Sequence, residues 1–167
     1  MLRIAKSLLT IVAVATIAAG ATSAAWTDSV TVTDNSFTTG FMDITVAPAS
    51  MLYTAANIYP GWDEDQSIVV TNSGSVPLNY NIAIAQTAGD ADLFPSPDFL
   101  LTIGTTLGGS ELYSGTVSGF AGLSSVRNLA PAANETLYFN VSLSGAAGNG
   151  LQNKAATFSI TFNATQP

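Results

Sequence analysis

Apolar and polar residues alternate along six short segments, and a period of two is the pattern of a strand with one buried face. The clearest example is residues 156–164, ATFSITFNA, in which Phe158, Ile160 and Phe162 alternate with threonine, serine and asparagine. The other five segments are residues 29–33, 42–47, 67–71, 78–86 and 136–143. The pattern therefore predicts a chain built mainly from short strands.

Glycine, proline and asparagine gather between these segments, as they do in tight turns. The turn clusters are residues 59–61, 72–74, 108–109 and 145–150. Residues 90–98 are interrupted by proline and are predicted to form a loop, and residues 119–128 are expected to hold one short helical turn. Short strands joined by such turns favour an all-β fold, a jelly-roll-like β-sandwich that forms a single domain.

The first 24 residues have a different character from the rest of the chain. Arg3 and Lys6 precede an apolar run over residues 8–19, and small residues follow it. This order is that of a secretory signal peptide. The alternative is a retained membrane anchor, although a spanning helix needs about 20 apolar residues. Cleavage fits after Ala21 or after Ala24, and we expect a secreted protein at the cell surface or in the extracellular space.

Charge narrows the range of partners. Removal of residues 1–24 leaves Arg127 and Lys154 as the only basic residues against eleven acidic ones. An acidic chain of this kind has no basic surface for nucleic acid, and anionic membranes repel it. We therefore expect neither a nucleic-acid partner nor a membrane partner once the signal peptide has been removed.

The sequence contains no cysteine and no histidine. It therefore cannot form disulfides, a Ser-His-Asp triad or a histidine-ligated zinc site. Two groups of acidic residues are expected to be solvated at the surface, and the alternative is that each binds calcium. Neither group has the spacing of an EF-hand. These groups are Asp63, Glu64 and Asp65, and Asp90, Asp92 and Asp98. We expect no catalytic residue, no metal and no cofactor.

Three asparagines lie in Asn-X-Ser/Thr triplets, which accept N-linked glycans in organisms that have the machinery. They are Asn134, Asn140 and Asn163.

Three pairs of motifs occur in order along the chain. The first pair is GATSAAWTD (residues 20–28) and NSFTTGFMDI (residues 35–44). The second is YPGWD (59–63) with VVTNSGSVPL (69–78), and the third is LQNKAATF (151–158) with FNATQ (162–166). Together they resemble the TasA/camelysin family of secreted matrix proteins. The chain departs from the family in the tryptophan before the acid at residue 63, in Gln152-Asn153, and in lacking long insertions and a lysine-rich composition.

The resemblance implies cleavage between Ala24 and Ala25, and a fibre built by donor-strand complementation, in which the N-terminal segment of one subunit completes the sheet of the next. The candidate donor strand is Ala25, Trp26, Thr27, Asp28, Ser29, Val30, Thr31, Val32 and Thr33. Trp26, Val30 and Val32 would lie on the same face of a strand, and Asp28 interrupts that apolar face. No proline in this segment blocks hydrogen bonding to a neighbouring strand. The alternative is an ordinary first strand within its own domain.

The leading functional hypothesis is a structural subunit of extracellular filaments, either of a biofilm matrix or of a pilus. Its partner would be further copies of itself, joined head to tail, with other matrix or cell-surface components as additional candidates. Two alternatives are a secreted camelysin-type metalloprotease and a monomeric adhesin or minor fibre-anchoring protein. The protease is disfavoured because the chain has no His-Glu-X-X-His motif.

Overall fold

The computed structural model describes residues 4, 6, 29–31, 33, 35–50 and 52–167. The chain divides into two units, residues 1–38 and 39–167. In the first unit, Ile4 and Lys6 are helical, and the described residues between 29 and 38 lie in no regular secondary structure. The strand predicted over residues 29–33 is therefore absent at its four described positions.

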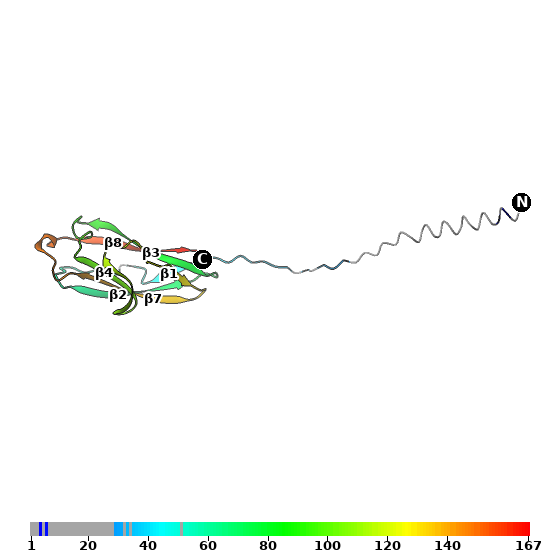
Figure 1. Ribbon diagram of the computed structural model, residues 1–167, viewed down its shortest axis with the longest axis horizontal. Coiled ribbons are helices and arrows are strands. Elements are labelled where there is room, and N and C mark those ends of the chain that lie inside the picture. The colour runs from blue at the N-terminus through cyan, green and yellow to red at the C-terminus, as the bar shows by residue number, and fades with distance from the viewer. Residues whose placement is uncertain (1–3, 5, 7–28, 32, 34, 51) are drawn as a thin grey trace. The chain divides into compact units, whose positions relative to one another are not determined.

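The second unit is built from strands joined by turns (Figure 1). The strands are β1 (Ile44–Ala47), β2 (Asp63–Asn72), β3 (Leu78–Gly89), β4 (Phe99–Thr106), β5 (Gly109–Thr116), β6 (Arg127–Leu129), β7 (Asn134–Leu143) and β8 (Ala156–Thr165), with a 3-10 turn η1 (Asn149–Leu151) before the last. Five of the six segments predicted from the alternating pattern are strands.

Two antiparallel sheets face each other. One has the order β1-β2-β7-β4-β5, and the other has the order β6-β3-β8 (Figure 1). The predicted all-β sandwich is thus confirmed. The pairing partners are distant in sequence: Ile82 of β3 lies opposite Phe162 of β8, and Gln66 of β2 lies opposite Phe139 of β7.

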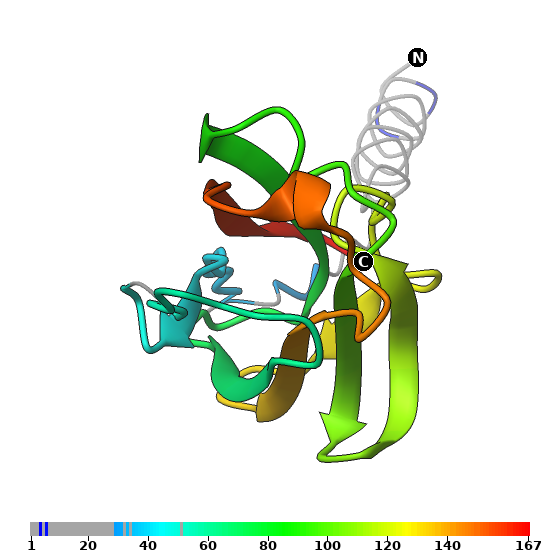
Figure 2. The ribbon, with the colours of Figure 1, turned by 90° about the vertical axis from the view of Figure 1, so that its left-hand side faces the viewer.

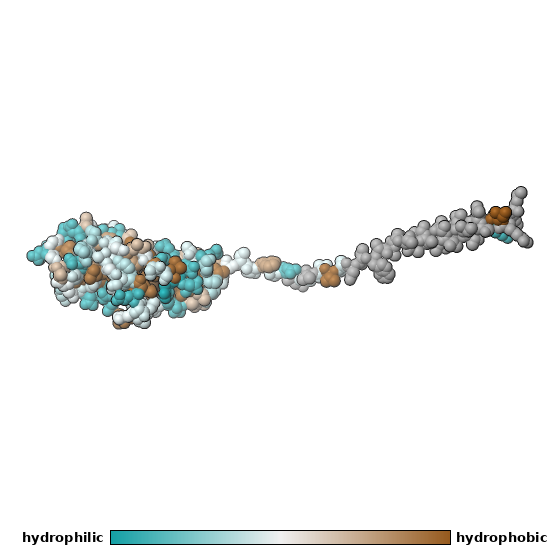
Figure 3. Space-filling view, viewed as in Figure 1, coloured by the Kyte–Doolittle hydropathy of each residue, from teal (hydrophilic) through white to brown (hydrophobic). Residues whose placement is uncertain are grey.

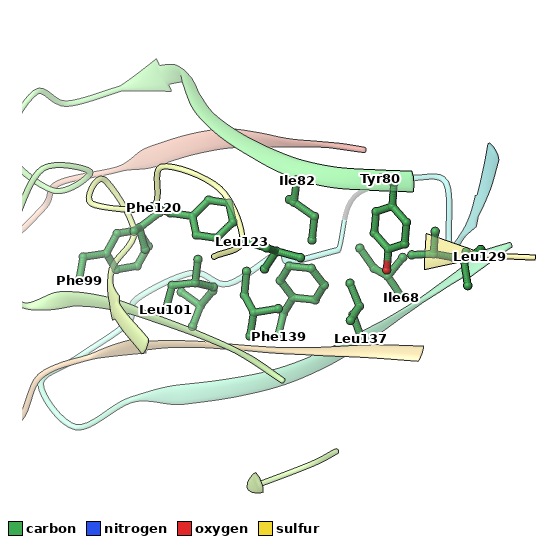
Figure 4. Close-up of a cluster of buried hydrophobic side chains, with 14 of the residues drawn as sticks. Ile68, Tyr80, Ile82, Phe99, Leu101, Phe120, Leu123, Leu129, Leu137 and Phe139 are labelled. Atoms are coloured by element: carbon green, nitrogen blue, oxygen red, sulfur yellow. The ribbon is translucent and has the colours of Figure 1, made fainter. Parts of the chain in front are cut away.

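The core lies between the sheets and follows the alternation of the strands. Leu78, Tyr80 and Ile82 of β3 are 0%, 1% and 2% exposed, and they meet Leu137 and Phe139 of β7, which are fully buried (Figure 4). Fully burying a side chain of this size stabilises the fold by about 1.5–3 kcal/mol. The two sheets are therefore held together mainly by apolar packing.

The helical turn expected within residues 119–128 is wrong. This stretch is a loop that inserts Phe120 and Leu123 into the core before β6 begins at Arg127. The amide of Leu123 donates to Asn81 Oδ1 at 2.8 Å, which holds the loop against β3. Apolar residues spaced three apart resemble a helical face in sequence, but here both belong to the buried core cluster without forming a helix. The loop predicted over residues 90–98 is confirmed.

The residues that lead into β1 are fixed by the turn after β2. The amide of Phe41 donates to Ser75 Oγ at 2.9 Å, and the Ser75 amide donates to the carbonyl of Phe41 at the same distance. The Ser73 amide donates to the carbonyl of Asp43 at 3.0 Å. A Cβ atom on Gly74 would lie 2.6 Å from the Phe41 oxygen, so only glycine allows this close approach.

Candidate functional site

Strand β8 forms one edge of the three-stranded sheet. Among the described strands it pairs with β3 alone. In an antiparallel pair, alternate residues direct their N–H and C=O groups away from the partner, so the outer side of β8 offers a row of backbone groups to a further strand. β8 is ten residues long and contains neither proline nor a charged residue. It is an edge to which another strand can add.

The other three edges are less open to pairing. β1 has four residues and β6 has three, which is short for a template. β5 carries Glu111 and pairs with β4 through an irregular register at Ile103 and Gly104. Short length, charge and bulges are the usual means by which proteins protect sheet edges. β8 lacks all three along its pairing from Phe158 to Thr165, where the register with β3 is regular.

An apolar groove runs beside the β8 edge. Phe158, Ile160 and Phe162 point between the sheets, yet each stays half-buried. The groove encloses about 910 Å³, and Ile68 of β2 and Val141 of β7 line its floor. The space between the two sheets is therefore filled by side chains along β3 but stays partly open along β8.

The opposite side of the groove is formed by the segment between β1 and β2. Residues 48–50 and 52–58, which we call the strap, lie in no strand or helix and line the groove together with β8. Figure 2 shows the cyan stretch that contains the strap between β8, in red, and β2, in green. Leu52, Tyr53 and Ile58 are half-buried and pack on the core. The Tyr53 hydroxyl donates to the carbonyl of Phe139 at 2.7 Å.

The environment of Tyr53 opposes ionisation of its phenol. Burial raises the pKa of Tyr53 above its ordinary value, and the negative charges of Glu64 and Asp65 raise it further. The phenol therefore remains a neutral hydrogen-bond donor to the β7 backbone throughout the physiological pH range.

Elsewhere on the second unit, the exposed apolar side chains do not form a comparable groove. Phe41, Tyr59, Leu107 and Val126 are 57–63% exposed and come from different turns and loops. Figure 3 shows apolar residues scattered among polar ones on the face turned to the viewer. Single exposed apolar residues are ordinary on soluble proteins. The groove beside β8 is the feature that calls for a functional explanation.

A charged cluster lies at the start of β8. Lys154 Nζ lies 2.7 Å from Asp92 Oδ2 and 3.9 Å from Asp90 Oδ1. The hydrogen bond with Asp92 and the nearby negative charges raise the pKa of Lys154. The backbone of Ala155 exchanges two hydrogen bonds with Asp90, at 2.7 and 2.8 Å. These two carboxylates therefore fasten β8 to the loop after β3.

The other acidic group, Asp63, Glu64 and Asp65, begins β2. Strand alternation places Glu64 on the opposite face from its two neighbours. Gln66 Nε2 donates to Glu64 Oε1 at 2.8 Å, and Asn140 Nδ2 donates to Asp65 Oδ1 at 3.0 Å. Within the part of the chain that the structure describes, no three Asp or Glu residues gather closely enough to hold a metal.

The remaining site predictions fall partly outside the described residues. Ala24, Ala25, Trp26, Thr27, Asp28 and Val32 lie outside them. Ser29, Val30, Thr31 and Thr33 are exposed, with Val30 at 87%. Asn134 and Asn163 are exposed on β7 and β8, whereas Asn140 is half-buried. No helix of the described residues is long and apolar enough to cross a membrane.

Comparison with known proteins places the chain in a family. The profile of a family described as camelysin metallo-endopeptidase matches residues 2–91, just over half of the chain, through β3. No curated protein matches the chain. The metal implied by that description does not fit the residues present, because the sequence has no histidine or cysteine. Asp90 and Asp92 pair with Lys154, and Glu64 and Asp65 accept hydrogen bonds from side-chain amides. The match confirms the resemblance to the TasA/camelysin proteins, and the chain belongs to the camelysin family.

Proposed function

We propose that this chain is a secreted structural subunit of extracellular filaments, in which residues 25–33 of one copy pair with β8 of the next. The observation that carries the proposal is the open β8 edge beside the apolar groove. The proposal accounts for a long neutral edge that would otherwise be a hazard to a secreted protein.

The candidate donor matches the acceptor in length. Residues 25–33 comprise nine residues and β8 comprises ten. At about 3.4 Å per residue in an antiparallel sheet, both extend for roughly 30 Å. One donor can therefore cover nearly the whole open edge.

The donor also matches the acceptor in pattern. An added strand directs alternate side chains between the sheets. Alternate positions of residues 25–33 carry Trp26, Val30 and Val32, which would cover the half-buried Phe158 and Ile160 of β8, and Asp28 interrupts this apolar face. The intervening positions carry alanine, serine and threonine, which suit a solvent-facing surface. Each fully covered large side chain contributes about 1.5–3 kcal/mol.

Strand donation of this kind generates a filament. Each copy gives one donor to a neighbour and receives one from another, so the interface is head to tail. The described residues of the first unit are exposed and lie in no strand, so a sheet of their own domain does not compete for them at those positions.

Electron microscopy of the purified chain beginning at Ala25 tests the proposal. Threads should form, and deletion of residues 25–33 should abolish them. A sharper test places the same charge on the two parities: Val30→Asp with Val32→Asp should prevent thread formation, whereas Ser29→Asp with Thr31→Asp should preserve it. Threads that survive the deletion, or that respond equally to both double substitutions, refute strand donation.

The family description supplies the competing function, a metallo-endopeptidase. We propose that the chain is not an enzyme, since its sequence provides no histidine or cysteine to ligate zinc or to act as a general base at neutral pH. Casein cleavage by protein purified from a protease-free host, abolished by a chelator, would overturn this proposal.

A further inference from the structure

We infer that consecutive copies stack end to end in the filament, and that the donor enters β8 at its Ala156 end and runs antiparallel to it; the inference rests on the proposed function. The free edge of β8 offers N–H and C=O groups to a neighbour that runs in either direction. The direction follows from two positions: the point where the donor's chain leaves one copy, and the point where β8 begins in the next.

The donor's chain leaves the sandwich at the end where β8 finishes. Residues 41–43 are hydrogen-bonded to Ser73 and Ser75 in the turn between β2 and β3. β3 follows that turn, and Asn79 near its start pairs with Thr165 at the end of β8. The exit of the donor's chain and the last residues of β8 therefore lie at the same end of the sandwich.

β8 begins at the opposite end. Ala156 pairs with Gly89, the last residue of β3, and Ala155 is hydrogen-bonded to Asp90 in the loop that follows. β8 has ten residues, which extend for roughly 30 Å. The exit of the donor's chain and the start of β8 in the same copy are therefore separated by about the length of the sandwich.

The chain leaves this end along the strand axis. Ile44, the first residue of β1, pairs with Asn72, the last residue of β2. Residues 41–43 continue past this pair along the turn, so the chain, followed toward its N-terminus, runs off the end of the sandwich. A head-to-tail contact repeats with the same polarity, so the next copy presents the start of its β8 here.

The connecting segment is too short to reach the far end of the next β8. Residues 34–39 separate the candidate donor from Gly40, and an extended chain spans at most about 3.6 Å per residue. Thr33 therefore lies within about 25 Å of Gly40, whereas the Thr165 end of the next copy lies roughly 30 Å beyond its near end. Thr33 consequently pairs near the start of β8, and the donor runs antiparallel to it.

An antiparallel donor also keeps the pattern of the existing sheets, since every strand pair of the described sandwich is antiparallel. The nine donor residues then cover residues 157–165 of β8. In this register Val30 and Val32 lie opposite Ile160 and Phe158, whose side chains line the groove. The two valines are thereby placed over the open part of the core.

Paired cysteines test the direction in the chain beginning at Ala25, which has no cysteine of its own. A disulfide requires Cα atoms within about 7 Å of each other, and Thr157 and Thr165 are roughly 27 Å apart along β8. Under mild oxidation, threads of Thr33→Cys with Thr157→Cys should give a ladder of covalent oligomers on a non-reducing denaturing gel. Thr33→Cys with Thr165→Cys is the matched variant, because both threonines of β8 are exposed, and it should stay monomeric on the gel.

A central pair separates failure of the direction from failure of strand donation. Ser29 and Thr161 are the middle positions of the donor and of residues 157–165, so Ser29→Cys with Thr161→Cys should give a ladder whichever way the donor runs. If this pair gives a ladder and Thr33→Cys with Thr157→Cys gives none, or Thr33→Cys with Thr165→Cys gives one, strand donation stands and the antiparallel direction is overturned. If no threads form, or the central pair gives no ladder, the proposed function and this inference both fail.

Discussion

Asn72 fastens three segments at one end of the sandwich, and its replacement by alanine should cost much of the fold's stability. The residue is fully buried at the end of β2. Its Nδ2 donates to the carbonyls of Val76 at 2.9 Å and Leu129 at 3.0 Å, and its Oδ1 accepts from the Gly74 amide at 2.9 Å. Each such bond contributes about 1 kcal/mol, so Asn72→Ala should lower the free energy of unfolding by about 3 kcal/mol.

Urea unfolding followed by circular dichroism measures this loss. At constant m-value, the midpoint should fall by the equivalent of about 3 kcal/mol, and the melting temperature by about 10 °C. Asn128→Ala is the matched control, since Asn128 is exposed and its Nδ2 also donates to Leu78 O and Asn79 Oδ1. It should cost less than about 1 kcal/mol.

Asn72→Asp separates the acceptor from the donor role. The aspartate keeps the hydrogen bond from Gly74 but places a carboxylate against two carbonyl oxygens, so at neutral pH it should destabilise at least as much as alanine. If Asn72→Ala costs no more than Asn128→Ala, the three bonds contribute nothing net and the reasoning is refuted.

Two further predictions concern other parts of the sandwich. Burial raises the pKa of Glu135, but hydrogen bonds from Arg127 and Tyr80 and the charge of Arg127 outweigh it and hold the pKa below its ordinary value. The contribution of ionised Glu135 to the free energy of unfolding is therefore present above about pH 4.5 and is lost as the pH falls through the lower pKa of the folded state. Glu135→Gln should make the free energy of unfolding depend less on pH in the acid range. An unchanged pH dependence would contradict this. Gly89 has φ +104°, and a Cβ there would lie 2.3 Å from the Ala155 oxygen, whereas Gly108 has φ +70° and open space around it. Gly89→Ala should lower the free energy of unfolding by at least about 1 kcal/mol more than Gly108→Ala, as measured by thermal unfolding, and equal losses would count against a steric cause.

Strands whose polar face separates the apolar residues could be predicted from sequence. β7 and β8 alternate in this way, so their period was visible. β4 also has one buried face, formed by Phe99, Leu101 and Ile103, but the apolar Leu100 between them obscures the alternation in the sequence. β5 is an edge strand with little burial on either face, and β6 is too short to show any pattern.

The candidate site illustrates a different limit. The sequence shows that residues 156–165 contain no charge and no proline, which is the signal of an unprotected strand. It does not show that this strand lies at an edge, because that depends on pairing between Asn79 and Thr165, which are far apart in the chain. The strap has no apolar period, so its position over the groove follows from tertiary packing alone.

The attachment of residues 40–43 to the turn after β2 has a mechanical consequence. In the proposed filament under tension, a pull on residue 38 would reach Gly40 and be shared between the backbone of β1 and the hydrogen bonds of Phe41 and Asp43 to Ser75 and Ser73 in the turn after β2. The bonds between β1 and β2 stand perpendicular to the strands, so a pull along β1 strains them together in shear. Such a joint resists more force than one that unzips bond by bond, so in the proposed filament the short first strand would carry the tension from one subunit to the next.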